Sequence, residues 1–156
     1  MMSDLAIGDI APEFDLEGNA GKRIKLSSFR GQPVVVYFYP KDDTPGCTKE
    51  AIAFTGLSAE FEKIGVAVVG ISPDTATKHD KFIAKHNLTV LLAADTQTAA
   101  AEAYGVWVEK SMYGKKYMGV ERSTFLVDAD GKIAEVWRKV KVPGHAEAVL
   151  EAARAL

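Results

Sequence analysis

The sequence predicts an α/β fold in which a mixed central sheet is flanked by helices, with a hairpin extension at the N-terminus. Apolar runs at 34–39 and 66–72 are continuous rather than alternating, as in strands buried on both faces. Segments with helical periodicity separate the strands, and the tight-turn sequence Asp128-Ala129-Asp130-Gly131 joins the last two strands. A strand–helix–strand–helix–strand order, followed by a hairpin and a helix, is typical of an α/β sandwich.

Composition restricts the class of protein. The 156 residues are 47% apolar and 26% charged, which fits one globular domain over 1–156. The formal charge of -2 argues against a nucleic-acid or membrane surface, and no apolar stretch approaches the ~20 residues that a membrane span needs. Residues 1–4 begin no recognisable secretory signal. A single cysteine, Cys47, excludes an internal disulfide and suits a reducing compartment such as the cytoplasm.

The elements follow in order along the chain. Turns divide the first 32 residues, and alternating pieces around 14–16 and 23–26 are expected to pair as a hairpin. After the strand at 34–39, a helix is expected from Pro45 to about Lys63, with Gly65 ending it. The later elements are expected as a strand at 66–72, a helix at 75–86 with Phe82 and Ile83 facing inward, a strand at 90–93, a short helix at 96–104 ending at Gly105, an irregular aromatic-rich segment at 106–119, strands at 123–127 and 132–138, and a helix at 143–153.

The loop between the first central strand and its helix is unusual. The apolar run breaks at Pro40, and Thr44 is a good N-cap whose hydroxyl is expected to accept a backbone N–H of the first turn. Pro45 then occupies the first helical position, where its missing N–H is harmless. Gly46 allows another chain or a ligand to approach the backbone closely. Cys47 therefore falls at the third helical position, just past the carboxyl end of a central strand, where open α/β sheets tend to place their sites.

A thiol at this position has two readings. The third helical position usually carries Glu or Gln in a capping box, and a thiolate there would face unpaired amides and the positive end of the helix dipole. The dipole contributes up to ~2 kcal/mol in favourable geometry. The alternative is core packing, because Cys47 is in register with Phe54, Leu57, Phe61 and Ile64 on the inward face. The complete loop before the helix favours a reactive thiolate.

These motifs resemble those of a known family. The pattern Pro40-x-x-x-Thr44-x-x-Cys47, together with Arg122 in a later Glu-Arg-Ser-Thr-Phe strand, resembles a peroxiredoxin. The fuller string 37–48, with Gly-Val-Trp at 105–107 and Glu-Lys-Ser at 109–111, is similar to the bacterioferritin comigratory protein branch, or Q type, and so is 125–133. The resemblance extends from Gly8 to the last helix.

The resemblance implies a thioredoxin-like fold and a thiol-dependent peroxidase that reduces hydrogen peroxide and organic hydroperoxides without a cofactor or metal. It implies that Cys47 is the peroxidatic cysteine. Charge moves from sulfur onto oxygen in that reaction, so donors aimed at the oxygens lower the barrier. The candidates are the Thr44 hydroxyl, the backbone amides of Gly46 and Cys47, and the Arg122 guanidinium. Pro40 is expected to keep water off the sulfur.

One departure from the family indicates how the enzyme is recycled. Many members carry a second, resolving cysteine, either five residues after the first or in the following helix. Here these places hold Ile52 and the sequence Phe-Ile-Ala at 82–84. A sulfenic acid at Cys47 must then be reduced by an outside thiol of the thioredoxin, glutaredoxin or glutathione type, in a one-cysteine mechanism. Related proteins are expected to be monomers or weak homodimers.

Rival functions are less well supported. A thioredoxin-like disulfide oxidoreductase needs Cys-x-x-Cys, and Thr44 occupies the first of these positions. His79, His86 and His145 lack metal-ligand spacing and are expected at the surface. A peroxide sensor that uses Cys47 oxidation as a signal shares the first chemical step and stays open.

Four further residues have less specific expectations. Glu50 lies one turn past the cysteine, where it could orient an arginine or simply occupy a solvated helix face. Trp107, Tyr113 and Trp137 are expected to pack rather than to contact substrate.

Overall fold

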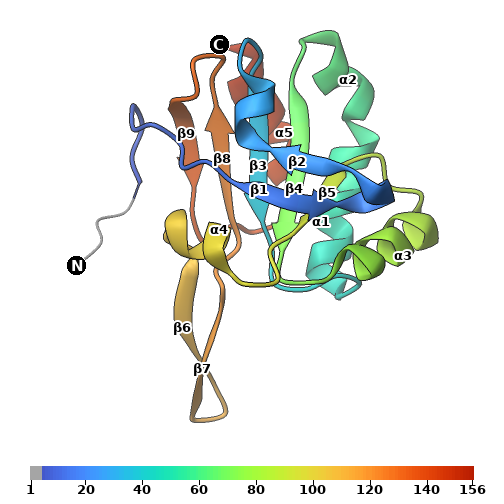
Figure 1. Ribbon diagram of the computed structural model, residues 1–156, viewed down its shortest axis with the longest axis vertical. Coiled ribbons are helices and arrows are strands. Elements are labelled where there is room, and N and C mark those ends of the chain that lie inside the picture. Colours follow the sequence, from blue (N-terminus) through green and yellow to red (C-terminus); the bar gives the residue numbers. More distant parts are fainter. Residues whose placement is uncertain (1–4) are drawn as a thin grey trace.

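A mixed sheet forms the centre of the computed structural model, which describes residues 5–156 (Figure 1). Within these residues the main sheet has seven strands in the order β2-β1-β5-β4-β3-β8-β9. Strands β3, β4 and β5 run parallel, β8 is antiparallel to β3, and β1 is antiparallel to β5. The bounds are β1 Asp15–Gly18, β2 Arg23–Lys25, β3 Val34–Phe38, β4 Ala67–Ser72, β5 Leu91–Ala94, β8 Ser123–Val127 and β9 Ile133–Trp137. The expected mixed sheet and N-terminal hairpin are confirmed.

Helices cover both faces of this sheet. One apolar cluster includes residues of α1, α2, α3 and α5, and the other lies under α4 and the N-terminal hairpin. The bounds are η1 Asn19–Gly21, η2 Leu26–Phe29, α1 Pro45–Gly56, α2 Ser58–Lys63, α3 Ala76–His86, α4 Ala99–Ala103 and α5 His145–Arg154. None of the helices within 5–156 has both the length and the apolarity needed to cross a bilayer. The expectation for residues 1–4, that they begin no secretory signal, lies outside the described residues.

The surroundings of strand β3 account for its continuous apolar sequence. Val34, Val36 and Phe38 belong to one cluster, whereas Val35 and Tyr37 belong to the other. All five side chains of the strand are at most 1% exposed. The strand is therefore buried on both faces, as its continuous apolar run predicted.

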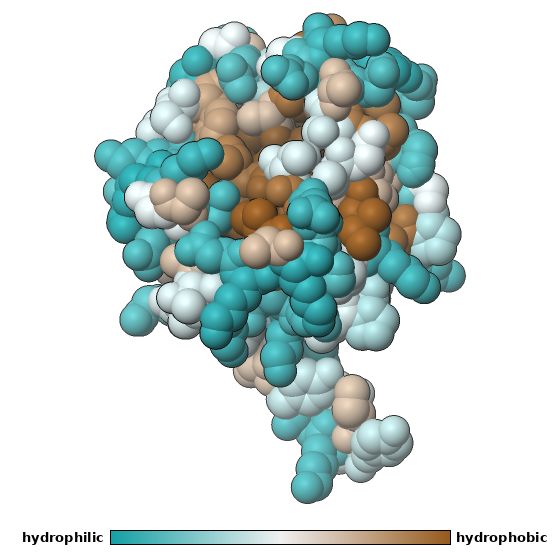
Figure 2. Space-filling view, turned by 90° about the vertical axis from the view of Figure 1, so that its right-hand side faces the viewer, coloured by the Kyte–Doolittle hydropathy of each residue, from teal (hydrophilic) through white to brown (hydrophobic). Residues whose placement is uncertain are grey.

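The prediction for 106–119 was wrong. This segment forms an antiparallel hairpin, β6 Trp107–Met112 and β7 Lys115–Val120, which projects from the body of the molecule (Figure 1, Figure 2). Tyr113 and Gly114, at its tip, have φ of 52° and 79°. Two positive φ values suit a two-residue hairpin turn, but Tyr is not a usual residue there. Since most of the hairpin is exposed on both faces, its sequence also lacks apolar alternation.

Other differences concern helix bounds and packing. The expected helix from Pro45 to Lys63 is interrupted at Leu57, directly after Gly56, a poor helix former. The helix expected at 96–104 begins only at Ala99, because Thr98 before it is left-handed, with φ of 58°. Packing was the wrong expectation for Tyr113, which is 98% exposed.

Candidate active site

Cys47 lies in the first turn of α1. Thr44 has the extended backbone of an N-cap, Pro45 is the first helical residue, and Cys47 is the third. The Cys47 side chain is 2% exposed and packs in the apolar cluster with Tyr37 and Tyr39. The cysteine is thus both packed and placed at the helix N-terminus, so the two sequence readings of this residue describe the same position.

The expected capping bond of Thr44 was wrong. Its hydroxyl makes no cap contact and instead donates to the carbonyl of Lys41 at 2.9 Å. The first turn is closed by the Thr48 amide, which donates to the Thr44 carbonyl at 2.8 Å. Because the hydroxyl proton is used within the loop, the lone pairs of the oxygen are left to accept a hydrogen bond.

The amides of the first turn are unused by the protein. Within residues 5–156, neither the Gly46 nor the Cys47 backbone N–H donates to an acceptor, since the first bond of the helix is that of Thr48. Such free amides at a helix N-terminus attract an anion or a developing negative charge. They are therefore available to an oxygen atom that binds beside the sulfur.

Arg122 reaches this helix from the neighbouring strand. Strand β8 pairs antiparallel with β3, and Ser123 lies opposite Phe38. The residue before β8 is therefore brought to the end of β3 where the loop to α1 begins. From there the Arg122 guanidinium donates through Nη2 to Cys47 Sγ at 3.2 Å. Burial lowers the pKa of Arg122, but its interactions with the Glu50 and Cys47 side chains outweigh burial and raise the pKa, so the cation persists.

Gly46 makes room for that guanidinium. A Cβ added at Gly46 would lie 3.1 Å from Arg122 Nη2, which is tighter than ordinary contact. The absence of a side chain at this position allows the arginine to lie close to the helix and to contact the sulfur. The close approach that the sequence predicted for this glycine is therefore made by Arg122.

Glu50 holds the other side of the arginine. Its Oε1 accepts from Arg122 Nη1 at 2.6 Å, and the side chain is 1% exposed. A solvated helix face was therefore the wrong alternative for Glu50, and orienting the arginine is the reading that its contact supports. Burial raises the pKa of Glu50 to about 7, although the nearby Arg122 opposes the shift. Its Oε2 has no partner within the described residues.

Pro40 is half-buried and follows Tyr39, just beyond the end of β3. It thus begins the loop that leads to Cys47. Its shielding of the sulfur stays a prediction, as do the catalytic roles of Thr44 and Arg122.

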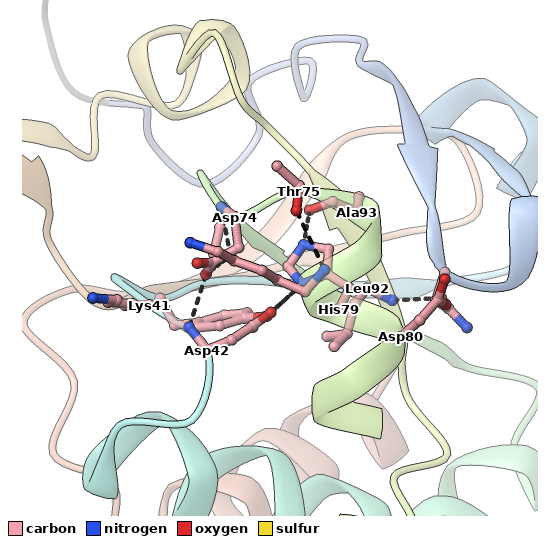
Figure 3. A network of polar contacts seen from close by, with 12 residues as sticks. Lys41, Asp42, Asp74, Thr75, His79, Asp80, Leu92 and Ala93 are labelled. Atoms are coloured by element: carbon pink, nitrogen blue, oxygen red, sulfur yellow. Dashed lines mark hydrogen bonds and ion pairs between the residues drawn. The ribbon is translucent and has the colours of Figure 1, made fainter. Parts of the chain in front are cut away.

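A buried polar network behind the loop was missed in the sequence (Figure 3). His79 is fully buried on α3, so the expectation of a surface histidine was wrong. Its Nδ1 lies 2.6 Å from Asp42 Oδ2 and its Nε2 lies 3.0 Å from the Ala93 carbonyl oxygen. The Tyr39 hydroxyl donates to the other oxygen of Asp42 at 2.5 Å. The network thus ties the loop before Cys47 to α3 and β5.

The same network continues into the end of β4. The Asp42 backbone N–H donates to Asp74 Oδ2 at 2.7 Å, and the Ser72 hydroxyl donates to the same oxygen at 2.7 Å. A sequence signal for His79 did exist, because it lies three residues before Phe82 on the inward face of the helix. Its partners, Asp42 and Ala93, could not be predicted, because they come from two other segments of the chain.

His145 is a second buried histidine that was wrongly expected at the surface. It is 7% exposed at the start of α5, and its Nε2 lies 2.8 Å from the Thr124 hydroxyl oxygen. The Phe54 and Trp137 rings pack edge-on against it. Burial, together with the nearby Arg122 charge, lowers the pKa of His145 to about 4. Within 5–156, no group of three or more His, Cys, Asp or Glu residues is arranged to hold a metal ion.

Comparison with known proteins gives a consistent result. The sequence model of the AhpC/TSA family matches residues 7–136. The chain is 47% identical over 147 residues to peroxiredoxin Bcp of Bacillus subtilis, covering 94% of both chains. It is 45% identical over 149 residues to peroxiredoxin Bcp of Escherichia coli, covering 96% of both.

Solved structures agree with these relatives. Peroxiredoxin Q of Xanthomonas campestris superimposes with a TM-score of 0.89 at 43% identity, covering 97% of this chain and 96% of that one. A mutant of Xylella fastidiosa PrxQ gives a TM-score of 0.92 at 40% identity, covering 99% and 98%. A further Xanthomonas campestris structure, of the bacterioferritin comigratory protein, is described in terms of alkyl peroxide reduction activity. With this fold and these relatives, the chain belongs to the AhpC/TSA family as a thioredoxin-fold peroxiredoxin of the Bcp and Q branch, a thiol-dependent peroxidase.

Proposed function

We propose that Cys47 is the residue that reduces the peroxide. Its thiolate attacks the terminal oxygen of a hydroperoxide R–O–OH, so that an S–O bond forms while the O–O bond breaks. The sulfur is oxidised by two electrons to a sulfenic acid, and the alkoxide that leaves takes up a proton to become an alcohol. The observation that carries this proposal is the 3.2 Å contact between Arg122 Nη2 and Cys47 Sγ at the N-terminus of α1. A guanidinium and a helix N-terminus together stabilise a thiolate.

The same groups suit the transition state. Negative charge moves from sulfur to the leaving oxygen, and fixed donors lower the barrier when they point to where that charge develops. The unused amides of Gly46 and Cys47 and the Arg122 guanidinium are such donors. Because the Thr44 hydroxyl donates to the Lys41 carbonyl, we expect it to accept the hydrogen bond of the peroxide O–H group. Pro40 would limit access of water.

Glu50 is proposed as a positioning residue for the arginine. Its Oε1 accepts from Nη1 at 2.6 Å while Nη2 donates to the sulfur, so one planar guanidinium joins the two groups. A fork of this kind holds its orientation better than a single flexible ammonium would. Glu50 thereby acts on the reaction through Arg122 rather than by touching the substrate.

The second half of the cycle uses an external thiol, because Cys47 is the only cysteine in the sequence. A first thiol R′–SH attacks the sulfenic sulfur, an S–S bond replaces the S–O bond, and hydroxide leaves with the thiol proton as water. A second R′–SH attacks the mixed disulfide and releases R′–S–S–R′ and reduced Cys47. The reductant is of the thioredoxin, glutaredoxin or glutathione type. We propose that the enzyme acts in the cytoplasm, where such thiols are maintained, as a monomer or weak homodimer.

A turnover assay tests this proposal against a peroxide sensor that is oxidised only once. With excess hydroperoxide and dithiothreitol, the enzyme is expected to consume many equivalents of peroxide, and Cys47→Ser is expected to consume none above background. Ser111→Ala, at an exposed position of the hairpin, serves as a control for the preparation and handling of a variant protein. Consumption that stops after one equivalent would identify a sensor, and full activity in Cys47→Ser would remove the assignment.

A further inference from the structure

A buried carboxylate lies behind the loop that carries Thr44. Asp74 comes two residues after the end of β4 and is 8% exposed. Because β3 and β4 run parallel, both strands end at the same edge of the sheet. Tyr39, just past β3, still donates its backbone N–H to the Ile71 carbonyl of β4 at 3.1 Å. The chain that leaves β4 is thereby brought beside the loop that leaves β3.

The Asp74 side chain is held by its own segment. Its Oδ2 accepts from the Ser72 hydroxyl at 2.7 Å, and the Ser72 oxygen accepts in turn from the Asp74 backbone N–H at 3.3 Å. Ser72 is itself 1% exposed, at the last position of β4. The carboxylate oxygen therefore faces the loop from a fixed position at the end of the strand.

The loop contacts that oxygen through its backbone. The Asp42 N–H donates to the same Oδ2 at 2.7 Å (Figure 3). The peptide unit that contains this N–H also contains the Lys41 carbonyl. Because the peptide is planar and trans, its N–H and its carbonyl point to opposite sides. The bond that fixes the direction of the N–H therefore fixes the direction of the carbonyl as well.

The Lys41 carbonyl is the acceptor of the Thr44 hydroxyl. Thr44 Oγ1 donates to it at 2.9 Å. Asp43, which lies between these residues, has a left-handed φ of 60°, so the chain turns back on itself here. Asp adopts this conformation more readily than most residues. One series of hydrogen bonds thus runs from the Asp74 carboxylate through the 41–42 peptide to the Thr44 hydroxyl.

We propose that Asp74 is a positioning residue for Thr44 in the peroxide step. The inference rests on the proposed function, in which the Thr44 hydroxyl accepts the hydrogen bond of the peroxide O–H group. A hydroxyl rotates about its C–O bond, so it accepts in one direction only when its proton is held elsewhere. Asp74 holds that proton in place by fixing the peptide that accepts it. Its charge also strengthens the series, because hydrogen-bonded groups polarise one another in a buried site.

Two substitutions at Asp74 weaken the series to different degrees. Asp74→Ala removes the acceptor, and the second-order rate constant for Cys47 oxidation by hydroperoxide is expected to fall about tenfold. Asp74→Asn keeps a neutral acceptor and is expected to lose about threefold, because a charge-assisted hydrogen bond is roughly twice as strong as a neutral one. Asp95→Ala is the matched control and should keep the wild-type rate. Asp95 is 1% exposed and also accepts backbone N–H groups, those at the start of α4.

A double-mutant cycle shows whether Asp74 acts through the Thr44 hydroxyl. Thr44→Val removes the hydroxyl and keeps the branched shape, and it is expected to slow oxidation at least as much as Asp74→Ala does. In the Thr44→Val background, Asp74→Ala is expected to cause no further fall, because the group that it orients is gone. Thr44→Ser keeps the hydroxyl and should stay sensitive to Asp74→Ala. An equal fall in the wild-type and Thr44→Val backgrounds would overturn the proposal.

Alkylation of Cys47 separates positioning from a general loss of structure. Iodoacetamide is attacked by the same sulfur but carries no peroxide O–H group, so its rate constant depends on the thiolate and not on the acceptor. We expect this rate constant to be equal in the wild type and both Asp74 variants, at a temperature where circular dichroism shows each protein folded. A peroxide rate and an alkylation rate that change by the same factor would contradict the positioning role. So would a wild-type peroxide rate in Asp74→Asn, which decides the matter if the alanine variant does not fold.

The outcomes also separate this inference from the proposed function. If Cys47 is oxidised at the wild-type rate in both Asp74 variants, only the positioning role of Asp74 is wrong. If Thr44→Val keeps the wild-type rate, the acceptor role of Thr44 is wrong and the inference fails with it, while the role of Cys47 stands. If Cys47 is not oxidised in the wild type, the proposed function fails first.

Discussion

The Arg122 guanidinium donates to the Cys47 sulfur at 3.2 Å across 75 residues of sequence. This contact depends on the antiparallel register of β8 on β3, which brings Arg122 to the start of α1. It places a persistent cation against the only thiol in the chain.

Removal of the arginine is expected to slow the peroxide step. Arg122→Ala should lower the second-order rate constant for Cys47 oxidation by roughly 10²–10³-fold, the usual effect of removing one fixed donor from a transition state. Arg122→Lys should recover only part of the loss, since an ammonium cannot contact Cys47 and Glu50 in the same fork geometry. Stopped-flow kinetics with hydroperoxide measures this. Arg154→Ala, on the exposed end of α5, is the matched control, and an equal rate in the two alanine variants would contradict the prediction.

A side chain at Gly46 is expected to displace the guanidinium. The added methyl group of Gly46→Ala would lie 3.1 Å from Arg122 Nη2, so the arginine must move away from the sulfur. We expect the oxidation rate to fall by about tenfold, within the range for weakening a fixed donor.

The matched control for that variant is Gly56→Ala. It lies in the same helix, and a Cβ there would meet nothing within 4 Å. This variant should keep full activity and gain about 0.5–1 kcal/mol in free energy of unfolding. A normal oxidation rate in Gly46→Ala would show that the contact between Arg122 and the sulfur does not depend on the glycine.

Glu50 is expected to make stability depend on pH. Burial raises its pKa from 4.5 to about 7, so between these values the folded protein holds a proton that the unfolded chain has lost. The free energy of unfolding therefore falls as the pH rises through this window. Between pH 5 and pH 8, the free energy of unfolding should fall by about 1–3 kcal/mol less in Glu50→Gln than in the wild type.

Urea unfolding at the two pH values measures the change. Glu62→Gln, at an exposed position of α2, should leave the pH dependence of the wild type unaltered. If Glu50→Gln kept the same dependence as the wild type, the carboxyl would not be the group that titrates.

His79 is expected to stabilise the loop through its two ring nitrogens. His79→Leu removes the contacts of the imidazole with Asp42 Oδ2 and with the Ala93 carbonyl oxygen, and should lower the free energy of unfolding by about 3 kcal/mol. His79→Gln should recover part of the loss, because its amide can donate to one of the two oxygens. Equilibrium unfolding provides the values. His86→Leu, at a partly exposed position on the same helix, should lose much less, and equal losses at the two positions would count against the network.

Much of the fold could be predicted because local patterns determined it. The continuous apolar run of β3, the proline and glycine after it, and the N-cap at Thr44 all act within a few residues of one another. They led to Cys47 at the third position of α1, where it lies. Arg122 could be associated with Cys47 only through the family resemblance, because the contact arises from strand pairing between distant segments.

The features that were missed have physical reasons. His79 is fully buried because Asp42 and Ala93 satisfy its nitrogens, and no pattern around residue 79 reveals those partners. The hairpin β6–β7 lacks alternation because solvent reaches both of its faces. The turn at its tip could not be recognised in the sequence, because Tyr113 adopts a positive φ there, which is usual for Gly, Asn or Asp.

Mass spectrometry after one equivalent of hydroperoxide, without thiol, tests whether Cys47 itself takes the oxygen from the peroxide. We expect one added oxygen on Cys47, one equivalent of alcohol, and loss of that oxygen when a thiol is supplied. Oxygen found only on the methionines, with Cys47 unmodified, would contradict it.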